Sequence, residues 1–364
     1  MKRSWVQRVW KREGLFASLL WILVLPLSFL YGAGVRVRNG FYSLRWKQSK
    51  HLPCMVVSVG NLTVGGTGKT PTTLWLAQAL KKNGFRVAIL SRGYKRTAGA
   101  TVILDPGLSR VVSGEGGAEN AIDAGDEPFM MAKLYSHKVG VGKKRYEAGN
   151  QILQSEHVDV FILDDGFQHR QLSRDIDLVL LGLEHKGWLM PAGPFREPRG
   201  VLRRADLCLV TGAREEWGAF LAGRQEKSAV FFGSLRPKVL VSWEGEQWQE
   251  ASLGLLVGKK IVAVSGIASA APFYRMIHDW EGEILDTVEF SDHHTYSAED
   301  WQRINRAARH ADLIITTEKD IFKLMRFPFA KKQLLALRVE MVVENGCALI
   351  KCVADAVRAK MRDA

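Results

Sequence analysis

The stretch VVSVGNLTVGGTGKT, from Val56 to Thr70, decides the fold class of this 364-residue chain. A β-branched apolar run leads into a glycine-rich turn, which ends in Gly68-Lys69-Thr70 and opens a helix. A turn of this kind binds phosphate, because its backbone N–H groups curl around an anion and the helix N-terminus adds partial positive charge. The motif therefore predicts a P-loop that binds a nucleoside triphosphate. A glycine-rich turn that binds nothing is the alternative.

Individual residues of this loop have expected roles. Lys69 would reach the β- and γ-phosphates, and the Thr70 hydroxyl would hold Mg²⁺. Thr63 stands where the usual pattern has its first glycine, but the glycines that follow it keep the backbone flexible. The nucleotide-binding residues that we predict are Thr63, Val64, Gly65, Gly66, Thr67, Gly68, Lys69 and Thr70.

Apolar strand patterns alternate with helical patterns on both sides of the loop. Strands are expected near residues 85–90, 158–163, 176–181 and 205–211, and the small, polar residues 97–125 are expected to form a long loop. The alternation indicates an α/β fold with a P-loop NTPase-like parallel sheet that is covered on both faces. Residues 228–243 have β composition without a helix, which predicts a two-stranded β linker to a second, smaller α/β domain. The expected divisions are a membrane-associated helix at 1–36, a P-loop domain at 37–230, and a C-terminal α/β domain with the linker strands at 231–364.

The net charge of +13 implies an anionic partner. Residues 14–35 carry no charge, and basic residues flank both ends of this segment. Positive charge on both sides fits a helix that lies in one leaflet of a membrane, with its flanks on phospholipid head groups. A full span, a cleaved signal peptide and a buried core helix are the alternatives. Nucleic acid is not an expected partner, because no face of interleaved aromatic and basic residues is identified.

An acidic pair follows another buried-strand pattern. The segment VDVFILDDG, Val158–Gly166, has the form of a strand that ends in Asp164 and Asp165. Ligands of such sheets bind beyond the carboxyl ends of the strands, so these carboxylates are expected beside the phosphate loop. One of the two would hold Mg²⁺, directly or through water. A pair of solvated turn aspartates is the alternative.

Other polar clusters carry weaker signals. Asp126-Glu127-Pro128, taken alone, is typical of a helix start. Asp292-His293-His294 is an acid/base pair, a metal site or an ordinary surface group; zinc is disfavoured because no third ligand stands at suitable spacing. Arginines suited to phosphate recognition lie at strand ends and in loops, at Arg92, Arg145, Arg170, Arg174, Arg196 and Arg199.

Together these segments resemble the tetraacyldisaccharide 4'-kinases, the lipid A 4'-kinases of Gram-negative bacteria. The resemblance runs from the apolar segment to at least residue 320 and is carried most specifically by LDDGFQHR with PAGPFREP. The matching motifs are GNLTVGGTGKTP (Gly60–Pro71), SRGY (Ser91–Tyr94), GDEP (Gly125–Pro128), LDDGFQHR (Leu163–Arg170), LMPAGPFREP (Leu189–Pro198), FSDHHTY (ending at Tyr296) and TTEKD (Thr316–Asp320). Lys95 after SRGY, where many relatives carry glycine, is a small departure.

The resemblance implies ATP-dependent phosphorylation of the 4'-hydroxyl of a tetraacylated disaccharide 1-phosphate at the cytoplasmic face of the inner membrane. It implies ATP and Mg²⁺ as cofactors and inner-membrane phospholipids as partners; no obligate protein partner is inferred. Asp126 would take the hydroxyl proton, and His293, expected in the other domain, would orient it. The remaining implied site residues are Lys69 on the phosphates, Thr70, Asp164 and Asp165 on Mg²⁺, and Glu127, Arg145, His169 and Glu197 near the substrate.

A membrane-associated P-loop switch ATPase that regulates a partner is the rival hypothesis. Such proteins carry a lysine where this chain has Val64, and TEKD is not the NKxD-type motif of a GTPase. Consumption of ATP that does not depend on the lipid acceptor would favour the switch.

Overall fold

The computed structural model describes residues 5–93, 101–106, 124–223, 228–244, 247–329 and 333–362. The chain folds into two compact units, neither of which is continuous in sequence. The first comprises Met1–Lys69, Leu163–Ser234 and Val343–Ala364, and the second comprises Thr70–Ile162 and Leu235–Val342. The division at residues 36 and 230 stays a prediction. Tyr94 and Lys95 lie outside the described residues.

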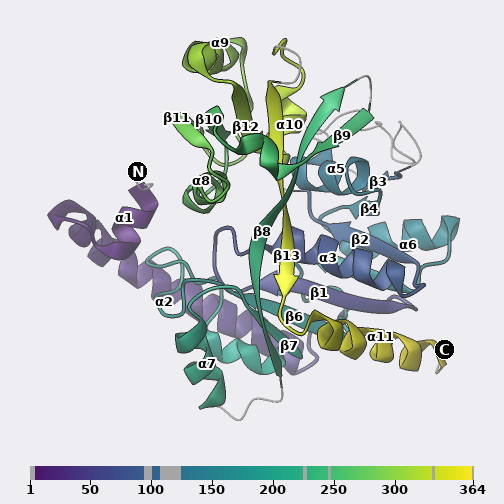
Figure 1. The fold of residues 1–364 in the computed structure, drawn as a ribbon. Helices are drawn as coiled ribbons and strands as arrows, with labels where there is room; N and C mark the ends of the chain where they lie inside the picture. The colour runs from purple at the N-terminus through teal and green to yellow at the C-terminus, as the bar shows by residue number, and fades with distance from the viewer. Residues whose placement is uncertain are drawn as a thin grey trace. The chain divides into compact units, whose positions relative to one another are not determined.

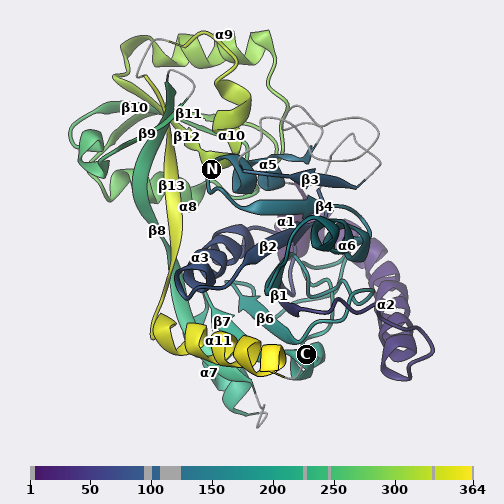
Figure 2. The ribbon, with the colours of Figure 1, turned by 90° about the vertical axis from the view of Figure 1, so that its right-hand side faces the viewer.

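The first unit contains a parallel sheet with helices packed on it. Strand β6 pairs in parallel with β1 on one side and with β7 on the other, and β7 pairs in parallel with the start of β8. Figure 1 and Figure 2 show α7 and α11 beside these strands. Its elements are α1 (Trp5–Lys11), α2 (Leu15–Ser43), β1 (Met55–Asn61), β6 (Ile176–Leu181), η1 (Arg199–Arg204), β7 (Leu207–Val210), α7 (Arg214–Ala222) and α11 (Gly346–Arg362).

Strand β1 is the buried centre of this unit. All seven of its residues are buried, as a near-continuous apolar run in a parallel sheet requires. Trp217 and Leu221 of α7 pack onto Val179 and Leu181 of β6 in one apolar cluster. The predicted α/β class is confirmed for this part of the chain.

The second unit contains strands of two kinds. Strands β2 and β4 are parallel, and β3 is antiparallel to β4. The order β11-β10-β12-β13 is parallel throughout. Its elements are β2 (Val87–Ser91), β3 (Val102–Leu104), α5 (Asp126–Lys133), β4 (Lys138–Val141), α6 (Arg145–Ser155), β9 (Gln247–Ala251), η2 (Leu253–Leu256), β10 (Lys260–Ser265), α8 (Ala271–His278), β11 (Glu283–Glu289), α9 (Ala298–Ala307), η3 (Ala308–His310), β12 (Leu313–Thr317), α10 (Glu318–Leu324) and β13 (Leu334–Val343).

Alternation along β10 explains the two layers of helices in this unit. Ile261 and Ala263 belong to the cluster that contains Phe273 and Ile277 of α8. Val262 and Val264 belong to a different cluster, which contains Ile304 of α9. Successive side chains of a strand point to opposite faces, so α8 and α9 cover opposite faces of this sheet (Figure 1).

Four elements cross the unit boundary: α3 (Lys69–Lys82), β5 (Val160–Asp164), β8 (Ala229–Glu244) and, by its last residue, β13. The first residues of β8, Ala229–Phe232, pair with β7, and its last, Leu240–Glu244, pair antiparallel with β9. The helix-free β stretch predicted at 228–243 is therefore present. The loop expected at 97–125 is wrong at one point, because Val102–Leu104 forms β3 against β4. This strand was not predicted because its apolar run is only three residues long and lies within a polar stretch.

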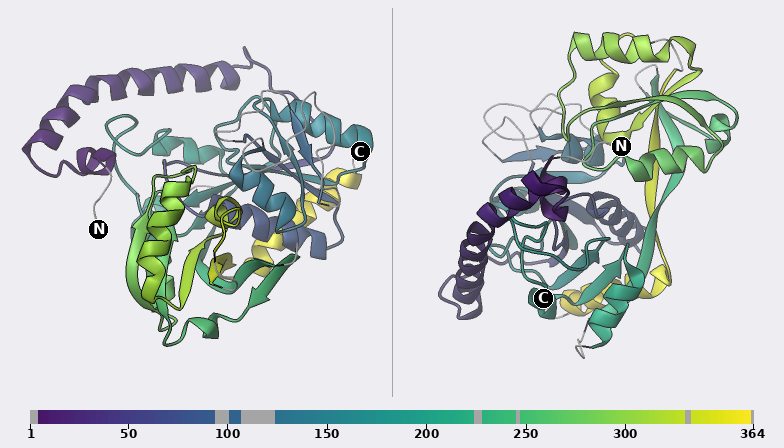
Figure 3. Two further views of the ribbon diagram at one scale, coloured as in Figure 1. Left: turned by 90° about the horizontal axis from the view of Figure 1, so that it is seen from above. Right: turned by 90° about the vertical axis from the view of Figure 1, so that its left-hand side faces the viewer.

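The apolar N-terminal segment forms two helices, with α1 folded against the start of α2 (Figure 3). Helix α2 is 29 residues long and continues to Ser43, past the expected end at residue 36. Pro26 lies inside it. Helix α2 is the one described helix that is long and apolar enough to cross a membrane, with a mean hydropathy of 2.0 in its most apolar window.

Candidate active site

The P-loop connects β1 to α3 in a backbone conformation that requires glycine. Gly65 has φ of 120° and Gly68 has φ of 85°, in a region that L-residues with a side chain rarely adopt. The Asn61 side chain donates a hydrogen bond of 2.9 Å to the Thr67 hydroxyl and ties the start of the turn to its end. Lys69 is the first residue of α3, where the helix N-terminus favours an anion.

The PAGPFREP segment braces this loop from the side. The Val64 N–H donates to the Pro194 carbonyl at 2.8 Å, and the Arg196 N–H donates to the Leu62 carbonyl at 2.8 Å. Thr63 lies between these two bonds and forms a β-bridge with Phe195. Two motifs that are more than a hundred residues apart therefore form one structure.

Three charged side chains meet beside the loop. The Lys69 Nζ lies 3.7 Å from Asp165 Oδ1, and the Arg196 Nη1 donates to both carboxylate oxygens of Asp165 at 2.9 Å. Asp165 has φ of 51°, a left-handed conformation at the turn that follows β5. Asp164 ends β5 and is buried, as is Thr70 in the first turn of α3. The structure thus places the predicted lysine beside Asp165, one member of the predicted acidic pair.

Asp126 and His293 also meet, within the second unit. The His293 Nδ1 donates to Asp126 Oδ2 at 3.2 Å, and both side chains are more than four-fifths buried. Asp126 is the first residue of α5, so the helix start that the sequence indicated is present together with the acid–imidazole contact. His293 was expected in the other domain, but it lies in the same compact unit as Asp126.

Lys323 of α10 is a third member of this cluster. Its Nζ lies 2.6 Å from Asp126 Oδ2 and donates to the His294 carbonyl at 3.1 Å. Burial raises the pKa of Asp126, but the hydrogen bonds and charges of His293 and Lys323 outweigh burial and lower this pKa below its ordinary value. The carboxylate is therefore ionised at neutral pH.

Helix α10 holds the neighbouring acid in the same way. Lys319, one turn before Lys323, forms an ion pair with Glu127. The matched TTEKD motif contains Lys319 but not Lys323, and neither lysine has a role predicted from the sequence. The signal in the sequence is the i, i+4 spacing of the two lysines, which places both ammonium groups on one face of the helix. Two adjacent acidic residues at the start of another helix, here Asp126 and Glu127, can then each form an ion pair with one lysine.

Three further predicted site residues lie at the start of α6, after β5 and before η1. Arg145 is the first residue of α6 and is buried. His169 follows β5, and its carbonyl accepts a hydrogen bond of 3.3 Å from Arg174. Glu197 is fully buried and forms ion pairs with Arg38 of α2 and Arg204 of η1. Their roles toward a substrate stay predictions.

Helix α2 docks on the PAGPFREP segment through polar bonds. The Trp21 indole donates to the Ala192 carbonyl at 2.9 Å, and the Tyr31 hydroxyl donates to the Arg196 carbonyl at 2.9 Å. The apolar side chains of α2 that remain exposed are Leu15, Phe16, Leu19, Ile22, Leu23, Leu27, Phe29, Leu30, Val37 and Phe41. One side of the helix is thus held by the protein, and a large apolar surface is left for another environment.

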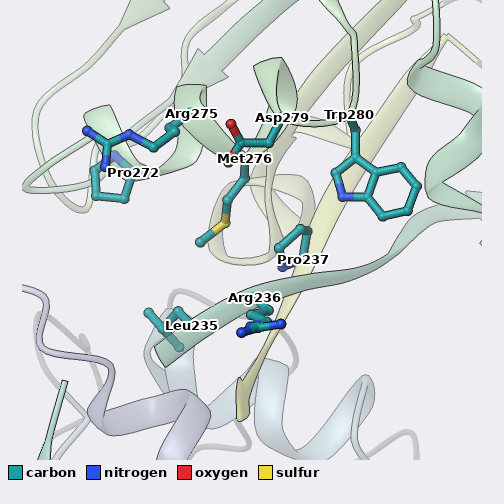
Figure 4. Close-up of a pocket in the computed structure, with 8 residues that line it drawn as sticks. All are labelled: Leu235, Arg236, Pro237, Pro272, Arg275, Met276, Asp279 and Trp280. Carbon is teal, nitrogen blue, oxygen red and sulfur yellow. The ribbon is translucent and has the colours of Figure 1, made fainter. Parts of the chain in front are cut away.

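A surface cavity of about 370 Å³ in the second unit involves neither cluster (Figure 4). It lies between the Leu235–Pro237 stretch of β8 and helix α8. Its lining residues are Leu235, Arg236, Pro237, Pro272, Arg275, Met276, Asp279 and Trp280. Most of these side chains are at the surface, so the cavity is an open groove.

Known proteins are similar to this chain in sequence and in structure. A family model described as tetraacyldisaccharide-1-P 4'-kinase (LpxK) matches residues 20–358. A tetraacyldisaccharide 4'-kinase of Syntrophus aciditrophicus is 37% identical over 94% of this chain and 95% of the relative. One of Dechloromonas aromatica is 32% identical over 99% of both chains. The crystal structure described as the "apo" form of LpxK from Aquifex aeolicus in complex with ATP is similar with a TM-score of 0.73 and 31% identity, over 92% of this chain and 98% of that chain.

Proposed function

Because this chain belongs to the family of tetraacyldisaccharide-1-phosphate 4'-kinases, we propose that it transfers the γ-phosphoryl group of ATP to the 4'-hydroxyl of a tetraacylated disaccharide 1-phosphate. The observation that carries this proposal is the P-loop lysine beside Asp165 and Arg196. Such a cradle binds the β- and γ-phosphates through backbone N–H groups and cationic side chains. ATP is the proposed donor because the similar structure from Aquifex aeolicus is described as a complex with ATP.

Magnesium is the proposed metal ion. In the described parts of the chain, no three His, Cys, Asp or Glu side chains gather to hold a metal by themselves. Mg²⁺ needs no such cage, because it takes one or two carboxylates and completes its shell with phosphate oxygens and water. Asp164, Asp165 and the Thr70 hydroxyl offer the hard oxygen donors that Mg²⁺ prefers. The bound ion would neutralise charge on the transferred phosphoryl group.

The protein's own groups have distinct tasks in the proposed reaction. Lys69 and Arg196 stabilise the charge that spreads over the phosphoryl oxygens, since this transfer depends on positioning and electrostatics more than on covalent chemistry. Asp126 accepts the proton of the 4'-hydroxyl as the new P–O bond forms and the bond to ADP breaks. His293 donates to Asp126 and holds the carboxylate in orientation. Glu127, Arg145, His169 and Glu197 are proposed to support the substrate or these groups.

The lipid acceptor requires the protein to work at a membrane. A lipid with long acyl chains does not leave the bilayer readily, since each buried methylene contributes about 0.8 kcal/mol. We propose that the exposed apolar side of α2 lies in one leaflet of the inner membrane from its cytoplasmic face, with anionic phospholipids on the basic flanks. The polar bonds of α2 to Ala192 and Arg196 favour a helix that lies along the protein over a separate span.

The test is an assay of the purified chain with ATP, Mg²⁺ and the tetraacyldisaccharide 1-phosphate in mixed micelles. We expect a product that carries one additional phosphate, located at the 4' position by mass spectrometry of its fragments. ATP consumption that is equal with and without the lipid, with no phosphorylated product, would contradict the proposal and favour the switch ATPase.

A further inference from the structure

We infer that Lys323 is a positioning residue of the phosphoryl transfer, which holds the Asp126 carboxylate and the His293 loop in one arrangement. The inference rests on the proposed roles of Asp126 and His293. Lys323 binds both sides of this pair, because its Nζ lies 2.6 Å from Asp126 Oδ2 and donates to the carbonyl of His294 at 3.1 Å. A single ammonium group thus connects the acid on α5 to the backbone beside the imidazole.

Burial makes this contact strong. The Lys323 side chain is only 10% exposed, and that of Asp126 is only 13% exposed. An ammonium group that is removed from water needs an acidic partner, and breaking such a pair leaves a buried charge without compensation. The pair therefore fixes the position of both groups far better than a surface salt bridge would.

Helix α10 is itself anchored to the histidine loop by a second route. The buried Asp320 accepts a hydrogen bond of 2.9 Å from the Gly266 N–H, and the Gly266 carbonyl accepts one of 3.3 Å from the His293 N–H. A side chain at Gly266 would have its Cβ only 2.8 Å from Asp320 Oδ1. The backbone of His293 has φ of 59°, a conformation that needs such support.

Helix α10 is also fixed to α5 and to the sheet. Phe322 packs edge-to-face on Phe129 of α5 at 5.5 Å. The buried Glu318 accepts hydrogen bonds from the Tyr135 hydroxyl at 2.7 Å and from Arg338 Nε of β13 at 3.1 Å. Lys323 therefore extends from a rigid platform, as a residue that orients a reactive group must.

The charged surroundings of Asp126 define what Lys323 contributes. His293, from the loop after β11, and Lys323, from α10, both bind Oδ2. Glu127, next on α5, is paired with Lys319. Burial, with a smaller contribution from the charge of Asp126, raises the pKa of the nearby Tyr296 hydroxyl. Lys323 keeps the carboxylate ionised and makes it a weak base. A weak base is sufficient here, because the loose transition state needs little proton transfer before the new bond forms.

The test compares Lys323→Met, Lys323→Ala and Lys238→Met. Lys323→Met keeps most of the side-chain volume and removes the charge. Lys238, an exposed lysine of β8 in the same unit that pairs with Glu340, is the matched control. For Lys323→Met we expect kcat to fall by about 10- to 100-fold with a nearly unchanged KM for ATP. The acid limb of kcat/KM should move to higher pH, because losing the cation raises the pKa of Asp126.

Chemical rescue separates positioning from a structural role. Lys323→Ala leaves a space that propylammonium fills, so this cation should restore part of the turnover, whereas propan-1-ol should not. Asp126→Asn should not respond to either compound. A Lys323→Met enzyme with more than half of the turnover and an unshifted pH profile would overturn the inference, as would a uniform loss without shift or rescue. Either result leaves the proposed function intact if Asp126→Asn is inactive, whereas a wild-type protein that does not phosphorylate the lipid contradicts the function itself.

Discussion

The hydroxyl of Tyr31 donates a hydrogen bond of 2.9 Å to the backbone carbonyl of Arg196. Tyr31 belongs to the apolar helix α2, and the Arg196 guanidinium holds Asp165 through both carboxylate oxygens. The backbone N–H of the same arginine bonds the carbonyl of Leu62 at the start of the P-loop. Arg196 thus connects the apolar helix, the nucleotide loop and the acidic pair.

Tyr31→Phe should weaken catalysis without weakening membrane attachment. The substitution removes one hydrogen bond, with a net contribution of about 1 kcal/mol, and keeps the apolar ring. We expect about a fivefold lower kcat in the lipid kinase assay and unchanged sedimentation with vesicles. Trp10→Phe is the control, because it removes a similar bond to the Pro191 carbonyl, away from Arg196. Equal losses in both variants would show that only the docking of the N-terminal helices α1 and α2 matters.

Lys69→Ala should damage nucleotide binding and turnover together. In its proposed role the lysine contributes a cation to the phosphates in the ground state and in the transition state, so its loss affects both binding and turnover. We expect kcat to fall by about 100-fold or more, with weaker ATP binding in calorimetry. Unchanged ATP affinity in this variant would place the phosphates away from Lys69.

Asp126→Asn and His293→Ala should lower turnover without weakening ATP binding. Neither residue contacts the P-loop lysine in the proposed roles, so ATP affinity should stay within a few-fold of the wild type. Turnover should fall by about 10²- to 10⁴-fold, the usual contribution of a positioned proton acceptor. Most of the activity surviving in Asp126→Asn would exclude this carboxylate as the base.

The buried His137 should make stability depend on pH. Burial, and to a lesser degree the charge of Lys81, lowers the pKa of His137 from 6.5 to about 4. Between these two values the unfolded chain binds a proton that the folded chain does not, so the free energy of unfolding falls as the pH falls. The stability is fully present above pH 6.5, and the loss by pH 4 is at most about 3 kcal/mol.

His137→Leu should remove this pH-dependent part of the stability. Neither ring nitrogen has a hydrogen-bond partner among the described residues, so an apolar side chain loses nothing there. The thermal midpoint of the variant should fall less between pH 7 and pH 4.5 than that of the wild type. His278→Gln, at an exposed position of α8, should behave like the wild type. Parallel curves for His137→Leu and the wild type would refute the assignment.

The exposed side of α2 should determine membrane binding. Leu23 and Leu30 are 73% and 69% exposed, and each would lose about 1.5–3 kcal/mol of favourable transfer if replaced by a charged side chain. Leu23→Glu with Leu30→Glu should reduce sedimentation with anionic vesicles by at least about 10²-fold in partition coefficient. Leu255→Glu, on η2, is the control. Unchanged binding in the double variant would mean that another surface attaches the protein.

Local patterns in the sequence predicted the elements that hold most of the proposed site residues. The apolar run before the glycine-rich turn became β1, and the acidic pair ends β5 as expected. The contacts of Arg196 and Lys323 could not be predicted, because they join residues that are far apart in the chain and depend on how loops and helices pack. Strand β3 was missed because three apolar residues within a polar stretch give almost no periodic signal.

The interleaved course of the chain has a consequence for how this protein can change. The chain passes from one unit to the other at four positions, after Lys69, Ile162, Ser234 and Val342. No single cut of the chain separates the two units. Recombination between two related genes at one breakpoint between residues 69 and 342 gives a protein in which at least one unit comes from both parents. Exchange of one proposed site, the loop with Lys69 or the carboxylate of Asp126, for a foreign counterpart at one breakpoint therefore requires at least one unit assembled from two parents.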